Sequence, residues 1–126
     1  MHTTEELIQL ALKEDIGPGD ITTDNLVEAG VSGRGVLLAK QNLVIAGLAV
    51  AETVFKALDP KIEFTANFAD GQKVRLGSTV ATVKGSLKAL LKGERTALNF
   101  LQRMSGIATQ ANDLVAKVAG TDVKLV

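Results

Sequence analysis

The sequence contains no cysteine, no tryptophan and no tyrosine, and its aromatic residues are four phenylalanines among 126 residues. Without cysteine, the chain has no disulfide framework, no thiolate metal site and no cysteine nucleophile. The scarcity of aromatic side chains excludes the stacking platforms that hold single-stranded nucleic acids. A hydrophobic core must therefore be built from leucine, valine, isoleucine and alanine.

An excess of charge of either sign is also missing, because 14 basic and 14 acidic side chains balance each other. Nucleic-acid binding needs a surplus of lysine and arginine to neutralise phosphates, so we expect no nucleic-acid partner. The longest apolar run, Leu43 to Ala51, is far shorter than the ~20 residues that cross a bilayer. The N-terminus also lacks the basic and apolar regions of a signal peptide. We therefore expect no membrane partner and a cytoplasmic location.

The first segment predicts a helix that ends near Asp15. Thr3 and Glu6 fit a capping box, in which hydroxyl and carboxylate bind free backbone donors at a helix start. Gly17-Pro18-Gly19 would stop the helix, because proline cannot continue it. The expected apolar stripe consists of Leu7, Leu10 and Ala11, joined by Ile8 and Leu12. Acidic residues near the helix end could bind a cation, but a solvated helix end is the simpler interpretation; they are Glu14, Asp15 and Asp20.

The middle of the chain predicts short strands around one helix. Strands are expected over residues 33–39, 43–46, 62–68, 74–76 and 80–84, and the helix over 48–58. Lys40–Asn42 would turn the first strand into the second, which returns beside it. The pattern indicates an α+β fold with a small antiparallel sheet or sandwich packed with helices.

After Gly85 the pattern becomes helical, with one apolar stripe from Ala97 to Val118. Gly106 would divide it into two helices, since glycine costs ~1 kcal/mol against alanine. We expect part of this stripe to be exposed in a monomer and to favour self-association. Gly120 would cap the helix, and Thr121–Val126 begins a strand with no turn or polar tail after it. Either the chain is cut where a second sheet begins, or this strand pairs at the edge of the same domain.

The most informative stretch is Gly93–Thr109, which reads GERTALNFLQRMSGIAT. It predicts an amphipathic helix whose polar face carries Glu94, Arg95, Asn99, Gln102 and Arg103. A solvated face with ordinary ion pairs would account for these residues. Arg95, however, is of the type that binds a planar carboxylate through two parallel hydrogen bonds.

Gly93–Thr109 also resembles the signature of the quinolinate phosphoribosyltransferases, or carboxylating nicotinate-nucleotide pyrophosphorylases. Ala11–Thr23 resembles the N-terminal motif of the same family. A sister group, the molybdenum-transport-associated pyrophosphorylase-like proteins, shares the Gly-Asp-x-Thr-Thr and Ser-Gly-Ile-Ala-Thr elements. That group generally lacks Glu-Arg-Thr-Ala-Leu-Asn, so Glu94–Asn99 favours the quinolinate enzymes.

The resemblance implies two parts of a longer architecture. Residues 1–104 would form an N-terminal α/β domain that covers the substrate and forms the dimer. Residues 105–126 would be the connecting helix and the first strand of an α/β barrel that this chain lacks. In the homodimer, or a higher oligomer, the N-terminal domain of one subunit would cover the barrel opening of the other.

The resemblance also implies a reaction. Quinolinate and phosphoribosyl pyrophosphate would give nicotinate mononucleotide, pyrophosphate and carbon dioxide, with Mg²⁺ in the full-length enzyme and no metal held by this chain alone. Arg95 would reach across the dimer to a quinolinate carboxylate. The motif residues assigned to positioning and packing are Glu94, Thr96, Asn99 and Ser105. The barrel would carry the catalytic residues, so we expect none within this chain.

A second hypothesis remains open. The chain could be a non-catalytic, hammerhead-like binding or assembly module, in which case the family motifs would report ancestry only.

Overall fold

The computed structural model describes residues 3–16 and 30–118, which form an α+β fold as the sequence predicts. The helices are α1 (Thr4–Ile16), α3 (Leu48–Leu58) and α4 (Leu87–Val118). The strands are β1 (Ser32–Leu38), β2 (Leu43–Val44), β3 (Glu63–Ala66), β4 (Lys73–Val74) and β5 (Thr79–Ser86).

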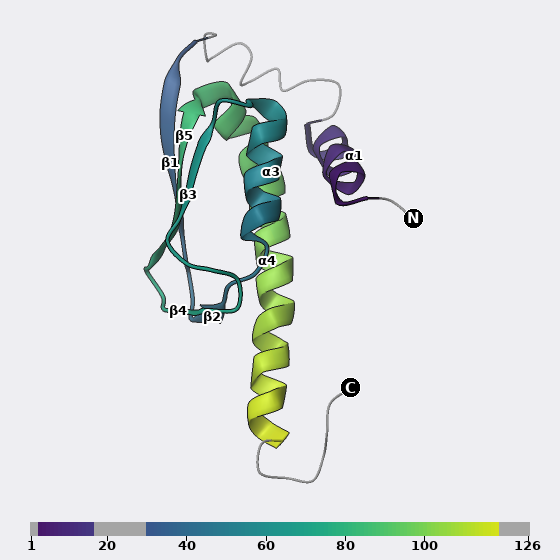
Figure 1. The fold of residues 1–126 in the computed structure, drawn as a ribbon, viewed down its shortest axis with the longest axis vertical. Coiled ribbons are helices and arrows are strands. Elements are labelled where there is room, and N and C mark those ends of the chain that lie inside the picture. The colour runs from purple at the N-terminus through teal and green to yellow at the C-terminus, as the bar shows by residue number, and fades with distance from the viewer. Residues whose placement is uncertain (1–2, 17–29, 119–126) are drawn as a thin grey trace.

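The strands form two antiparallel sheets, one in the order β1-β5-β3 and one that pairs β2 with β4. Helices α3 and α4 lie side by side along one face of the larger sheet, and α1 lies on the far side of these helices from the sheet (Figure 1). The core is therefore enclosed between the sheet and a helical layer. Within the described residues, it draws on α1, α3, α4 and both sheets.

The pairing of the first two strands differs from the sequence prediction. A hairpin between 33–39 and 43–46 was expected, but β1 pairs with β5 and β2 pairs with β4. The connection after β1 is bound elsewhere, because the side-chain oxygen of Asn42 accepts the backbone N–H of Leu76 at 2.8 Å. Strand β5 offers a longer partner than the two-residue β2, and its Ala81 and Val83 are buried on the helical face.

Helix α1 begins as predicted, since the Thr3 hydroxyl accepts the backbone N–H of Glu6 at 3.1 Å. The predicted apolar stripe was wrong in part: Leu7 and Leu10 are 48% and 49% exposed, whereas Ile8 and Leu12 are buried. Ile8 and Leu12 lie four residues apart on one helical face. That face packs toward α3 and α4, so the face containing Leu7 remains open to solvent.

Helix α4 is continuous from Leu87 to Val118, so the predicted division at Gly106 was wrong. The cost of one glycine, ~1 kcal/mol, is small beside the hydrogen bonds and packing that hold the neighbouring turns. The proposed domain boundary between residues 104 and 105 falls inside this helix and stays a prediction. The predicted helix stop at 17–19, the Gly120 cap and the strand over 121–126 lie outside the described residues.

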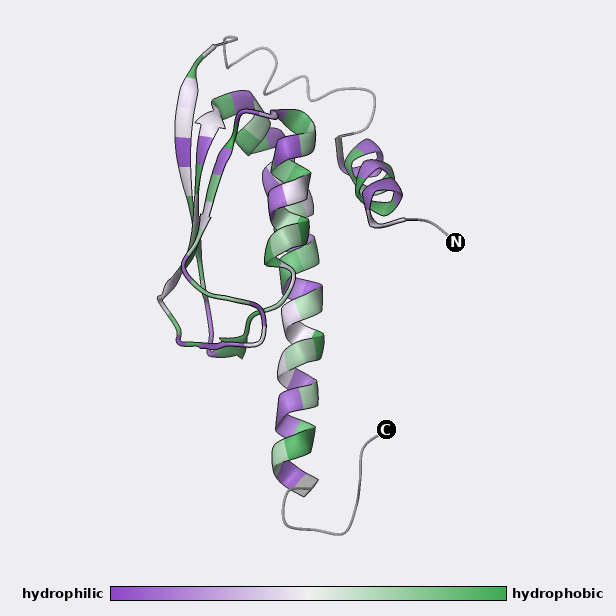
Figure 2. Ribbon diagram, in the orientation of Figure 1, coloured by the Kyte–Doolittle hydropathy of each residue, from purple (hydrophilic) through white to green (hydrophobic). Residues whose placement is uncertain are grey.

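The end of α4 projects beyond the sheets, and apolar residues continue along it (Figure 2). Ile107, Leu114 and Val115 are 69%, 48% and 54% exposed, which confirms that the apolar stripe is partly open. Self-association through this stripe stays a prediction. Across residues 3–16 and 30–118, no helix combines the length and the apolar character that a membrane span needs.

Candidate functional site

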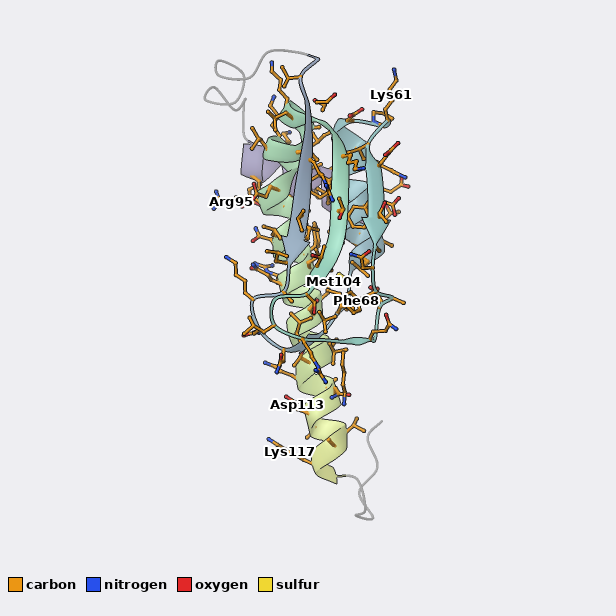
Figure 3. All side chains as sticks on the ribbon, turned by 90° about the vertical axis from the view of Figure 1, so that its left-hand side faces the viewer. Lys61, Phe68, Arg95, Met104, Asp113 and Lys117 are labelled. Atoms are coloured by element: carbon orange, nitrogen blue, oxygen red, sulfur yellow. The ribbon has the colours of Figure 1, made fainter. Side chains whose placement is uncertain are left out.

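The predicted polar face of α4 is exposed along its length. Its members are Glu94, Arg95, Asn99, Gln102 and Arg103. Figure 3 shows the Arg95 side chain extending outward from the helix. Its guanidinium forms no hydrogen bond or ion pair with any residue that the structure describes. A guanidinium carries five N–H donors in a planar fork, and none of the described residues accepts a hydrogen bond from those of Arg95.

The stretch of α4 that carries Arg95 is rich in basic residues. Between Leu87 and Gly106, α4 carries four basic residues and one acidic residue, Glu94, although the whole chain is neutral. The basic residues are Lys88, Lys92, Arg95 and Arg103. This positive charge attracts negatively charged ligands, and the Asp15 carboxylate, which Thr96 binds beside Arg95, offsets part of it.

The glycine that opens the motif lets α4 approach α3 closely. A Cβ atom built on Gly93 would lie 3.0 Å from the Phe55 ring and 3.1 Å from a methyl group of Leu58. Residue 93 is therefore glycine for a packing reason, and the turn that carries Arg95 sits directly on α3.

Thr96 follows Arg95 and lies on a different side of the helix, facing into the protein. It is fully buried, and its hydroxyl donates a hydrogen bond to a carboxylate oxygen of Asp15 at 2.5 Å. Successive helical residues are turned by ~100°, so one side chain can bind within the fold while its neighbour faces solvent. This contact joins the two family motifs, one ending α1 and the other within α4.

Sequence reasoning did not find the contact between Asp15 and Thr96. One signal was available, because Asp15 continues the face that Ile8 and Leu12 define, at positions i, i+4 and i+7. A carboxylate at the end of a buried stripe indicates a buried polar partner. Asp15 thus binds a hydroxyl. Among the described residues, it belongs to no group of three or more acidic or histidine side chains that could hold a metal ion.

Ser105 is buried in the structure, and its predicted positioning role stays a prediction. Its hydroxyl accepts the backbone N–H of Ala46 at 3.0 Å and donates to the carbonyl of the same residue at 3.1 Å. One turn later, the Thr109 hydroxyl accepts the N–H of Val44 at 2.9 Å. The two hydroxyls thus bind the free edge of the segment that carries β2.

The spacing of these hydroxyls matches the strand geometry. Ser105 and Thr109 are four residues apart, ~6 Å along a helix, and alternate residues of a strand are ~6.7 Å apart. The opposite edge of the segment is satisfied by β4 and its turn, because the N–H of Ile45 donates to Gln72 at 3.0 Å. The hydroxyls of the Ser-Gly-Ile-Ala-Thr element therefore accept the backbone N–H groups that a neighbouring strand would otherwise bind.

A groove of about 400 Å³ lies between the end of β1, the connection to β2 and α4. Its lining is mostly apolar, with Lys40, Gln41 and Gln102 among the polar members. Gln102 lies two turns along α4 from Arg95 on the same face. Glu94 and Asn99 are exposed, and no described contact assigns either of them to packing.

Comparisons with known proteins place this geometry in a family. A family model described as "Quinolinate phosphoribosyl transferase, N-terminal domain" matches residues 20–105. The chain belongs to this family.

Relatives of this quinolinate phosphoribosyl transferase N-terminal domain are similar over most of the chain. A probable nicotinate-nucleotide pyrophosphorylase (carboxylating) from Synechocystis is 43% identical over 121 residues, which cover 94% of this chain and 40% of the relative. Quinolinate phosphoribosyltransferase (decarboxylating) 1 from Nicotiana glauca is 40% identical over 112 residues, covering 86% and 32%. The chain therefore spans less than half the length of these relatives.

Solved structures agree with the same assignment. The nicotinate-nucleotide pyrophosphorylase from Francisella tularensis superposes with a TM-score of 0.86 at 34% identity, covering 92% of this chain and 41% of that one. The enzyme of the same name from Ehrlichia chaffeensis superposes with a TM-score of 0.88 at 34% identity, covering 98% and 45%. The fold described above is thus the fold of quinolinate phosphoribosyl transferase N-terminal domains.

Proposed function

We propose that this chain acts as the N-terminal domain of a carboxylating nicotinate-nucleotide pyrophosphorylase, in which Arg95 binds a carboxylate of quinolinate. The observation that carries the proposal is the exposed Arg95 guanidinium, which no described residue engages, on a basic stretch of α4. Family membership supports the choice of reaction. A cytoplasmic location and a homodimeric state are part of the proposal.

The chemistry of quinolinate suits a guanidinium. Quinolinate is a rigid dianion with two adjacent carboxylates on a pyridine ring, so a planar fork of N–H donors can fix its orientation. In the proposed reaction, the ring nitrogen bonds to C1 of the ribose as pyrophosphate leaves. The carboxylate beside that nitrogen then leaves as carbon dioxide, and a proton takes up the electron pair left on the ring carbon. Cations near the ring stabilise that developing charge.

Arg95 supplies only part of this site. A dianion and a leaving pyrophosphate need more positive charge than one side chain gives, and the resemblance assigns the remaining groups to the barrel. Within residues 3–16 and 30–118, no group of three or more histidine, aspartate or glutamate side chains could hold a metal ion. We therefore assign no described residue to Mg²⁺ and route no step through it.

Kinetics of the full-length enzyme test the role of Arg95. Arg95→Ala should raise the KM for quinolinate by about 10- to 100-fold, because a hydrogen bond to a charged group contributes ~1.5–3 kcal/mol and ~1.4 kcal/mol is tenfold. Arg95→Lys should recover only part of the loss, since lysine lacks the planar fork. The control is Arg75→Ala, which removes an exposed arginine from the turn after β4. An unchanged quinolinate KM in Arg95→Ala would overturn the proposal.

Mixed dimers test whether Arg95 acts across the subunit interface. Subunits with Arg95→Ala are combined with subunits inactivated in the barrel, each inactive or impaired alone. If Arg95 serves the partner's barrel, the mixed dimer gains one intact site and activity returns. If Arg95 serves its own barrel, or the chain is a free-standing assembly module, mixing restores nothing.

A further inference from the structure

We propose that Asp15 and Thr96 are positioning residues for Arg95. The hydrogen bond between their side chains fixes the turn of α4 that presents the guanidinium. This inference rests on the proposed function, because it concerns how Arg95 is held for quinolinate.

The contact is short, and its donor is buried while its acceptor is half-buried. The Thr96 hydroxyl, fully excluded from solvent, donates to the Asp15 carboxylate at 2.5 Å. A hydroxyl bound to an ionised carboxylate makes a shorter and stronger hydrogen bond than a pair of neutral groups does. Removing the acceptor would leave a buried hydroxyl unsatisfied, which biases the helix away from its present position.

Asp15 is itself held in place by the packing of α1. Ile8 and Leu12 are buried in the common core and lie on the same face of α1 as Asp15. Through them, α1 is anchored to the layer of α3 and α4, and Asp15 is presented at the end of the anchored face. The half-buried Asp15 carboxylate is therefore held on the side of α1 that packs against α4.

The position of this contact along α4 explains why it bears on Arg95. Thr96 is the next residue, in the same turn of a continuous helix, so a shift of one backbone position moves the other. Gly93 rests on Phe55 on the α3 side of that turn, and Ser105 is bound to Ala46 ~13–14 Å farther along. Asp15 constrains the same turn of α4 from the side of α1, through its hydrogen bond with Thr96. A displacement of ~1 Å in a binding group can cost up to ~100-fold.

The test is steady-state kinetics of the full-length enzyme with Thr96→Val, which keeps the branched shape and removes the hydroxyl. We expect the quinolinate KM to rise about 5- to 20-fold, with kcat and the KM for phosphoribosyl pyrophosphate changed by less than about twofold. Thr96→Ser keeps the donor and should restore the KM. Asp15→Ala removes the acceptor from the more accessible side and should reproduce the effect if Thr96→Val does not fold.

A double-mutant cycle separates positioning from general destabilisation. If Thr96 acts through Arg95, then Thr96→Val should add nothing to the quinolinate KM of an Arg95→Ala enzyme. The control is Val74→Ala, which removes buried methyl groups from β4 and lowers stability, yet should leave the quinolinate KM unchanged. Independent, multiplying effects of the two substitutions would overturn the inference.

The outcomes also distinguish this inference from the proposed function. If Arg95→Ala weakens quinolinate use while Thr96→Val and Asp15→Ala do not, the positioning role is wrong and the proposed function stands. If Arg95→Ala has no effect on the quinolinate KM, the proposed function fails, and the positioning role fails with it.

Discussion

Two threonines in this chain allow the hydroxyl contact between α4 and β2 to be measured by itself. The Thr109 hydroxyl donates to the carbonyl of Ser105, four residues earlier, at 2.7 Å. The Thr53 hydroxyl makes the same bond to Ala49 at 2.8 Å. Only Thr109 also accepts a distant N–H, that of Val44, at 2.9 Å. Thr109→Val and Thr53→Val therefore remove the same local bond, and differ in the contact with β2.

The magnitude follows from what each substitution leaves behind. Thr109→Val leaves the N–H of Val44 without its acceptor. Val44 is buried, and the opposite side of its strand pairs with β4, so the cost is that of an unsatisfied buried donor, ~1–3 kcal/mol. Thr53 is exposed, so Thr53→Val should change stability by less than ~0.5 kcal/mol. We expect a difference of about 1–2 kcal/mol between the variants.

Equilibrium urea denaturation of the two variants measures this difference as a shift in midpoint at unchanged slope. Hydrogen exchange adds a local readout, because the Val44 amide should lose protection in Thr109→Val and keep it in Thr53→Val. Equal midpoints, with the Val44 amide still protected in Thr109→Val, would refute the view that α4 hydroxyls serve as a strand edge.

Further stability predictions follow from the packing and from the start of α3. Gly93→Val should destabilise the fold by about 1–3 kcal/mol in urea denaturation, because its side chain would overlap Phe55 and Leu58. Gly106→Ala should stabilise it by about 0.5–1 kcal/mol, since an added Cβ meets nothing within 4 Å; a loss of stability would contradict this. Asp70→Ala should lower the melting temperature by several degrees, at a cost of ~1–2 kcal/mol, because this carboxylate accepts the backbone N–H groups at the start of α3; an unchanged melting temperature would exclude a capping role.

Local features of the fold could be predicted from the sequence because they depend on neighbours in the chain. The capping box at Thr3, the helix over 48–58 and the exposed polar face around Arg95 are of this kind. Each is set by side chains within one or two helical turns. The family resemblance then supplied a role for Arg95, which spacing and composition could not.

Features that depend on distant partners could not be predicted in the same way. Alternating apolar residues identify a strand but not its neighbour, so the pairing of β1 with β5 was missed. The bond between Asp15 and Thr96 spans 81 positions and has no local signature beyond the face of α1. At Gly106 the local propensity predicted a break that does not occur. The tertiary contacts of Ser105 and Thr109, on either side of it, hold α4 together.

The central claim is that this domain supplies the arginine that binds quinolinate, and equilibrium binding tests it most directly. Quinolinate is titrated calorimetrically into the full-length enzyme and into its Arg95→Ala variant, with Arg75→Ala as the control. We expect a Kd about 10- to 100-fold larger for Arg95→Ala, equivalent to ~1.4–2.8 kcal/mol, and an unchanged Kd for Arg75→Ala. The same quinolinate Kd in Arg95→Ala and in the unmodified enzyme would contradict it.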